Sequence, residues 1–337
     1  MSFWRQLHDK LELGEPVFLC LVAHNTTHSP GTRGAKMFVE PDGSITGTIG
    51  GGGMEADVID LGVEVLEEGE FEPDYQTLVH RKEGVDEEEQ SGLICAGKQT
   101  HVYYLCRPGR DLEVLAEVVR RNEADESGLL VLDEDGIRLE SEDHIDPQTP
   151  PVRLREDGED WQYEEQIVEW KRAAVLGGGH VGAAVCRQLD LLGYAIENFD
   201  VRDDVFTFRQ NEWADHKHVV DDYADCGELI RYPGLTHVIV VTSDYPSDVR
   251  ALLGVVEREA DFPYIGAMGS PAKLHAIADD LRDHGVSDQT VDDFHAPIGL
   301  EMTSNKPAEI AVSIASELLR LREELFPHAK PPEPADL

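Results

Sequence analysis

The chain has 337 residues, and its 68 acidic side chains against 29 lysines and arginines give a formal net charge of -39 at pH 7. Nucleic acids and anionic lipid surfaces bind clustered cations, so this charge excludes them as partners. We expect the acidity to reflect adaptation to high salt, in which screening weakens the repulsion between carboxylates. The length is sufficient for two domains that each bury a core.

The composition indicates a soluble, cytoplasmic protein. The first ten residues, MSFWRQLHDK, are charged and lack the apolar stretch of a signal peptide, and no apolar run is long enough to cross a bilayer. The five cysteines lie far apart without a CxxC pair, so neither a disulfide framework nor a thiolate zinc site is expected. The histidines form no HExxH pattern, and no metal site is predicted.

Residues 1–150 are predicted to form an α/β domain. Apolar residues form strand-like runs in some segments and recur at helical spacing in others. The expected elements, in chain order, are a helix over residues 1–14, a strand over 16–23, a hairpin turning at Pro41-Asp42-Gly43, a helix from Met54 to Gly69, a strand over 101–106, a helix over 112–119 and a hairpin turning at Asp135-Gly136.

Residues 151–169 are predicted to be an acidic linker, because beyond Trp161 and Tyr163 they show little apolar periodicity. In residues 170–326 strands and helices alternate, which predicts a Rossmann-like domain with a parallel sheet covered by helices on both faces. The expected strands lie near 173–176, 195–201, 216–220, 237–242 and 263–266, and a final helix spans 307–325. The proline-rich tail, 327–337, is predicted to be disordered.

The first glycine-rich segment, TGTIGGGGME, runs from Thr46 to Glu55 and places four consecutive glycines before a predicted helix. Glycine loses more backbone freedom on folding than any other residue, so ordering a glycine run is costly. Glycine runs are often linkers, but here an apolar strand pattern and an amphipathic segment flank the run. We therefore expect something to approach this backbone closely enough to require the absence of side chains.

The second glycine-rich segment, AAVLGGGHVGAAV, fits G-x-G-x-x-G with Gly177, Gly179 and Gly182, directly after a strand and at the start of a helix. In this fingerprint the first glycine makes the tight turn, the second lets a pyrophosphate approach, and the third packs the helix on the strand. Amides at the helix start, where His180 lies, would then face the phosphates.

Asp200 ends the next strand, at about the distance downstream where the fingerprint requires an acidic residue. A carboxylate there would bind a ribose hydroxyl pair and repel the 2′-phosphate of NADP, although Arg202 could weaken that preference. The crevice is thus predicted to bind NAD(P) or another nucleotide. A Rossmann-like fold with an empty crevice is the alternative, since fold does not imply function.

Further crevice residues are predicted at the ends of the next two strands. Thr242 ends one strand, and Asp248 lies near the start of the following helix. Gly269 and Ser270 lie in the next strand-to-helix connection. Helix capping by Asp244, Ser247 or Asp248 is the alternative interpretation, since such residues commonly cap helices.

Several motifs occur together along the chain. The first domain contains SPGTRGAKM, GTIGGGGMEADVI and GLICAGK, and the second contains LGGGHVG, FDVRDD, TSDYPSD, YIGAMGS, APIGLE and KPAEIAVSIASE. With these motifs the chain resembles the xanthine dehydrogenase accessory factor family, also called XdhC/CoxI, along most of its length.

The resemblance implies an amino-terminal α/β domain peculiar to the family and a carboxy-terminal Rossmann domain. It also implies a role in maturing molybdenum hydroxylases of the xanthine or carbon monoxide dehydrogenase type. In that role the protein would bind molybdenum cofactor, support replacement of an oxo ligand by a sulfido ligand, and deliver the product to the apoenzyme. A cysteine desulfurase as sulfur donor and a homodimeric state are further expectations from the family.

The chain departs from the family pattern at several positions. Gly53 stands where the family has a cysteine, so a thiol role is absent there. Ala96 replaces a glycine next to Cys95, and Thr242-Ser243 replaces a Thr-His pair. The segment PIGLEMTSNKPAEIA also differs from the usual motif, so we expect a different cofactor pocket.

The glycine run and the resemblance together predict a site in the first domain for a phosphate-bearing ligand, the pterin cofactor. Consecutive glycine amides can form a nest that holds an anion. In so acidic a protein, such a ligand also needs local cations. The residues expected to line this site are Gly50, Gly51, Gly52, Gly53, Arg33, Lys36 and Lys98.

Two residues beside this site have two interpretations each. Glu55 would either bind a ligand hydroxyl or cap the helix. Cys95 would either carry a persulfide or touch molybdenum as the catalytic residue, or be a plain buried cysteine.

Two functions follow from these observations. The first is an accessory protein that holds and hands over a cofactor without turnover of its own. The second is an NAD(P)-dependent oxidoreductase that uses the Rossmann crevice. The missing Tyr-x-x-x-Lys pair and the two-domain motif set favour the first. A nucleotide-sensing regulator is a third, weaker interpretation.

Overall fold

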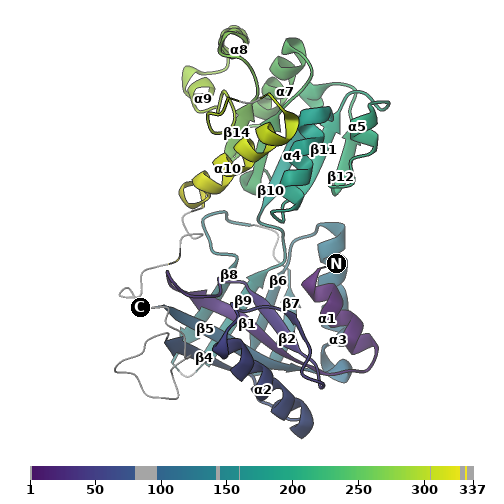
Figure 1. The fold of residues 1–337 in the computed structure, drawn as a ribbon, viewed down its shortest axis with the longest axis vertical. Coiled ribbons are helices and arrows are strands. Elements are labelled where there is room, and N and C mark those ends of the chain that lie inside the picture. The colour runs from purple at the N-terminus through teal and green to yellow at the C-terminus, as the bar shows by residue number, and fades with distance from the viewer. Residues whose placement is uncertain are drawn as a thin grey trace. The chain divides into compact units, whose positions relative to one another are not determined.

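The computed structural model describes residues 2–79, 97–141, 145–158, 160–303, 305–326 and 331. The chain divides into two compact units, one reaching Val168 and the other beginning at Glu169 (Figure 1).

The first unit contains three helices and nine strands among its described residues. They are α1 (Phe3–Glu12), β1 (Val17–Asn25), β2 (Lys36–Val39), β3 (Ile45–Gly47), α2 (Gly53–Glu68), β4 (Asp74–Val79), β5 (Lys98–Cys106), α3 (Pro108–Ala124), β6 (Leu129–Asp133), β7 (Gly136–Glu140), β8 (Val152–Asp157) and β9 (Asp160–Gln166).

Two antiparallel sheets organise this unit. The five-stranded sheet has the order β3-β2-β1-β5-β4, and the four-stranded sheet has the order β7-β6-β9-β8. The central strand β1 is buried on both faces, as its continuous apolar sequence predicts. Leu19 and Leu21 pack in a core shared with α1, α3 and the second sheet, whereas Phe18 and Cys20 pack in a core shared with α2.

Residues 151–169, expected to be a linker, form β8 and β9 and so belong to the sheet of the first unit. The prediction was wrong because the polar positions of these strands are paired with each other rather than solvated. Glu164 of β9 is buried, and it binds Arg153 and Arg155 of β8. Charged residues on one face therefore hid the strand pattern that Trp161 and Tyr163 form on the other face.

The second unit alternates strands and helices. Its elements are β10 (Arg172–Leu176), α4 (His180–Asp190), β11 (Ala195–Asp200), α5 (Phe206–Arg209), β12 (His216–Val219), η2 (Tyr223–Asp225), α6 (Cys226–Leu229), η3 (Pro233–Leu235), β13 (Thr236–Val240), α7 (Tyr245–Glu257), β14 (Tyr264–Ala267), α8 (Pro271–Asp283), α9 (Asp288–Asp292) and α10 (Pro307–Leu325).

All five strands are parallel and have the order β12-β11-β10-β13-β14. Helices α4 and α10 cover one face, side by side in Figure 1, and α7 and α8 contribute to the core on the other face. The α/β class and the parallel Rossmann sheet are therefore confirmed. The strand order reverses between β10 and β13, the position at which such sheets open a crevice at the carboxyl ends of their strands.

Two further predictions concern the carboxy-terminal tail and membrane-spanning segments. The tail predicted to be disordered lies outside the described residues, apart from Pro331. Among the described helices, none combines the length and the apolar character needed to cross a membrane.

Candidate functional site

The glycine loop of the second unit has the geometry that its fingerprint predicts. Gly177 has a φ of +121°, and a Cβ there would lie 2.5 Å from the Val241 carbonyl oxygen, so only glycine fits this turn. A Cβ at Gly182 would lie 1.9 Å from the Gly177 carbonyl oxygen, which explains the close approach of α4 to the loop. A Cβ at Gly179 would meet no atom of the described chain within 4 Å, so this position faces open space.

Helix α4 begins at His180, an exposed residue directly after Gly179. The first amides of any α-helix lack intrahelical partners, and the helix dipole adds positive potential at that end. The loop therefore presents donors beside the open space at Gly179, an arrangement able to bind a phosphate.

Asp200 is fully buried at the end of β11 and lies directly against the glycine loop. Its Oδ2 accepts a hydrogen bond from the Gly178 amide at 2.8 Å. The guanidinium of Arg202 donates to both carboxylate oxygens at 2.9 Å, and the Arg202 amide donates to Oδ1 at 3.0 Å. Burial opposes ionisation, but these hydrogen bonds prevail and hold the pKa of Asp200 below its usual value.

The hydrogen bonds to Gly178 and Arg202 limit the ability of Asp200 to bind a ligand. Its carboxylate already has protein partners, so a ribose hydroxyl would have to displace Arg202, whose side chain is 42% exposed. Arg202 is thus the more accessible member of the pair, and it presents a cation at the crevice.

A second polar cluster lies after β13 and β14. Thr242 donates a hydrogen bond to Asp248, and the fully buried carboxylate of Asp248 pairs with Lys273 of α8. Burial is the largest influence and raises the pKa of Asp248, although Lys273 and Thr242 oppose it. Sequence reasoning did not assign Lys273 to the site; its place one turn into the helix after the YIGAMGS loop was the available signal.

Two neighbouring residues cap helices, Asp244 as the capping alternative predicts and Ser270 in addition. Asp244 caps α7 by accepting from the Ser247 amide at 3.0 Å, and Ser270 caps α8 by accepting from the Lys273 amide at 3.3 Å. Gly269 lies beside Leu274, against which a Cβ would come within 3.1 Å. Ser270 and Gly269 therefore have structural roles in this loop.

The glycine run of the first unit is folded tightly against the chain itself. Gly50, Gly51 and Gly52 all have positive φ, and a Cβ at Gly50 would lie 2.5 Å from the Gly31 amide nitrogen. The backbone that approaches this run so closely is therefore that of residues 30–31. This close packing explains the absence of a side chain at Gly50 without a ligand.

Glu55 binds the amides that a ligand would need. Its Oε2 accepts from the Thr48 hydroxyl at 2.7 Å, the Ile49 amide at 3.2 Å and the Gly51 amide at 3.1 Å. A carboxylate of the chain thus occupies the position expected for an anion at this loop. Glu55 thus ties residues 48–51 to the first turn of α2, whereas the N-cap residue, Gly52, makes no side-chain cap hydrogen bond. The predicted contact of Glu55 with a ligand hydroxyl stays a prediction.

The cations expected around this run lie in two places. Arg33 and Lys98 line one pocket of about 500 Å³. Lys36 has other partners: its Nζ lies 2.8 Å from Glu165 Oε1 and donates to the Gly34 carbonyl oxygen at 2.9 Å. Cys95 lies outside the described residues.

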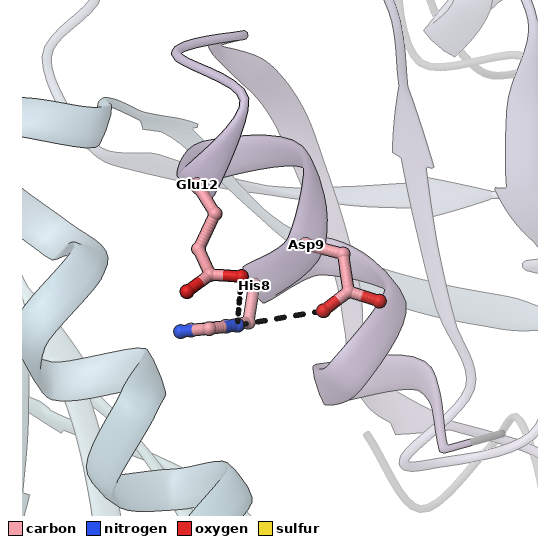
Figure 2. A group of neighbouring side chains, drawn as sticks. All are labelled: His8, Asp9 and Glu12. Atoms are coloured by element: carbon pink, nitrogen blue, oxygen red, sulfur yellow. Dashed lines mark ion pairs between the residues drawn. The ribbon is translucent and has the colours of Figure 1, made fainter.

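One group of potential metal ligands comes together on α1 (Figure 2). His8 Nδ1 lies 3.6 Å from Asp9 Oδ1 and 3.9 Å from Glu12 Oε2. Both carboxylates are exposed, and side chains adjacent or one turn apart on the same helix come this close without a metal. We assign no metal to this group.

The parallel sheet, the glycine loop and the acidic residue at the end of β11 define the second unit as a Rossmann-type domain. Residues 174–318 match the XdhC Rossmann domain, and residues 11–80 match the XdhC and CoxI family. The chain belongs to the XdhC and CoxI family.

Two similar proteins illustrate the extent of the match. A crystal structure described as a xanthine dehydrogenase from Bacillus halodurans shares the fold, with a TM-score of 0.68, 20% sequence identity and coverage of 96% of each chain. The uncharacterized protein YqeB from Escherichia coli strain K12 is 22% identical over 291 residues, 86% of this chain. The chain spans 40% of the length of YqeB.

Proposed function

We propose that this chain is an accessory factor for a molybdenum hydroxylase of the xanthine or carbon monoxide dehydrogenase type. In this role it binds molybdenum cofactor, supports its sulfuration and delivers it to the apoenzyme. The observation that carries the proposal is the presence of both family domains in one chain, over residues 11–80 and 174–318. A molybdenum hydroxylase apoenzyme, a cysteine desulfurase and a second copy of the chain are the proposed partners.

The residues of the first unit fit the anionic part of this cargo. A phosphate-bearing pterin is negatively charged, and in a protein with a net charge of -39 a cluster of cations favours its binding. Arg33 and Lys98 provide such a place in one pocket.

The described cysteines of the first unit do not fit the metal end of the cargo. Cys20 and Cys106 are fully buried, and burial raises the pKa of both thiols well above the usual value. A thiolate at either position is thus disfavoured. The sulfur chemistry predicted for Cys95 concerns a residue that lies outside the described part of the chain.

The second unit is proposed to bind a nucleotide, NAD(P) or another, at the open space beside Gly179. The same loop supports a second candidate function, an NAD(P)-dependent oxidoreductase. The specific observation in its favour is the environment of Gly177, Gly179 and Gly182: a Cβ would clash at the first and third and meet open space at the second, as the dinucleotide-binding fingerprint requires.

Analysis of the small molecules bound to the purified chain separates the two functions. The full chain would be purified from cells that make molybdenum cofactor, denatured, and its released ligands identified by mass spectrometry. Bound pterin, together with activation of an apo molybdenum hydroxylase, is the result expected for an accessory factor. NAD(P) without pterin, reduced in a substrate-dependent way, would overturn it in favour of the oxidoreductase.

A further inference from the structure

We propose that the pocket shared by Arg33 and Lys98 is a phosphate-binding site. It lies within the first unit, between β1, β4, β5 and β8, and its volume of about 500 Å³ is in the usual range for small-ligand sites. Its polar and charged lining residues include His24, Arg33, Lys98, Arg153 and Arg155. The expected ligand is a small organic anion with a phosphate monoester.

The charge of this pocket is opposite to that of the protein. Across the chain acidic residues outnumber lysine and arginine by 68 to 29, whereas the pocket brings four cationic side chains together with one acidic residue, Glu156. The Glu156 carboxylate accepts a hydrogen bond from the Tyr75 hydroxyl at 2.5 Å, so it is already engaged. Positive potential is therefore concentrated where the chain as a whole repels anions.

Arg33 contributes a guanidinium group to this pocket. It is half-buried, and burial lowers its pKa. Among the residues that the structure describes, its guanidinium has no ion-pair partner, although its amide is fixed by a 2.8 Å hydrogen bond to Asn25 Oδ1. A partly desolvated cation without a counter-charge is costly, and a bound anion would remove that cost.

His24 lies beside Arg33 and responds to its charge. Burial first, and then the positive charge of Arg33, lower the pKa of His24. The imidazole is thus neutral at pH 7, and it can donate one hydrogen bond to a phosphate oxygen without adding charge.

Strand β8 supplies the other two guanidinium groups. Arg153 and Arg155 alternate along the strand, so they lie on the same face. Both bind Glu164: Arg153 Nη2 lies 2.7 Å from Oε2, and Arg155 Nε lies 2.8 Å from Oε1. One carboxylate neutralises only one of the two charges and holds both side chains in place. The Arg155 side chain remains 60% exposed and can reach an anion.

The site differs from the one that the glycine run predicted. At the run, Glu55 already accepts the Gly51 amide. The pocket instead uses side-chain cations, and two of them come from the segment expected to be a linker. The identification of the phosphate ester as that of the pterin cofactor rests on the proposed function, whereas the anion site itself does not.

Equilibrium dialysis of the full chain against radiolabelled inorganic phosphate tests the site, with chloride balancing the ionic strength. The variant Arg33→Gln should bind phosphate at least about tenfold more weakly, because a charged hydrogen-bond partner is lost. Arg33→Lys should recover part of the affinity. Arg320→Gln, which changes an exposed arginine of α10, is the matched control and should bind as the wild type does.

Two further measurements keep the test decisive. Gly179→Val fills the open space of the Rossmann loop, so unchanged phosphate binding by this variant assigns the bound phosphate to the first unit. The melting temperature of Arg33→Gln should equal or exceed that of the wild type, since an unpaired half-buried cation is removed. A marked decrease would show that the guanidinium has a structural role instead.

Each remaining outcome decides one of the two proposals. No binding by the wild type, or equal binding by Arg33→Gln, would overturn the phosphate site. If Arg33→Gln loses phosphate but the purified wild type carries no pterin, the anion site stands and the accessory function is contradicted. If pterin is bound equally by wild type and Arg33→Gln, the accessory function stands and the site is wrong.

Discussion

Replacing Asp200 by asparagine should weaken the second unit by loosening the glycine loop. The carboxylate is fully buried, and it accepts hydrogen bonds from the Gly178 amide and from Arg202. Asparagine keeps one acceptor but leaves the Arg202 guanidinium without its counter-charge. We expect a loss of about 2–3 kcal/mol in the free energy of unfolding. This loss lies at the lower end of the cost of removing one partner from a buried ion pair, because Arg202 remains partly solvated.

The same substitution has a predictable pH dependence. The pKa of Asp200 is lower in the folded state than in the unfolded chain, so its contribution is complete above the unfolded value, about 3.9, and is lost as the pH falls through the folded value. The difference in stability between wild type and Asp200→Asn should therefore be constant near neutral pH and shrink below about pH 4.

Urea denaturation of both proteins at a series of pH values, followed by circular dichroism, measures this difference. Each point must be taken at the same high salt concentration, because screening changes the stability of so acidic a chain. A stability difference near zero at pH 7, or one that grows as the pH falls below 4, would refute the role assigned to the Asp200–Arg202 pair.

Substitutions at four other positions test the rest of the account. Gly179→Val should abolish nucleotide binding, measured by calorimetry, with little loss of stability. Gly182→Ala should destabilise the second unit by about 1–3 kcal/mol, measured by thermal melts, because its Cβ would clash with the Gly177 carbonyl. Glu55→Ala should destabilise the first unit by about 1–3 kcal/mol through loss of its accepted hydrogen bonds, and Glu55→Gln by less; equal effects in denaturant melts would contradict this. Burial lowers the pKa of His237 to about 4, so between about pH 6.5 and 4 the unfolded chain binds one proton more than the folded chain. As the pH falls across that range, the free energy of unfolding should therefore decrease by about 3 kcal/mol. The variant His237→Gln should lack this decrease.

The second unit could be predicted well because its signals are local. Short apolar strands alternate with helical segments, and the spacing of Gly177, Gly179 and Gly182 specifies one particular turn. What the sequence could not show is that Asp200 is already bound by Arg202, since that contact depends on how the chain turns after β11.

The first unit was harder to predict because its key contacts are long-range. Residues 152–166 look like a solvated acidic segment until Glu164 is seen between Arg153 and Arg155 on the neighbouring strand. Likewise, the glycine run gave no sign that residues 30–31 would pack against Gly50 or that Glu55 would fold back onto the Gly51 amide. Arg33 and Lys98 were predicted as cations of a site, but their shared pocket depends on β8.

The most direct test of the account is the pterin content of the full chain, purified as wild type and as Arg33→Gln from cells that make molybdenum cofactor. We predict that the wild type carries a pterin phosphate and that Arg33→Gln, still folded, carries at least about tenfold less. A wild-type chain without pterin would contradict the accessory function, and an equal content in the variant would contradict the assignment of the phosphate to the pocket around Arg33.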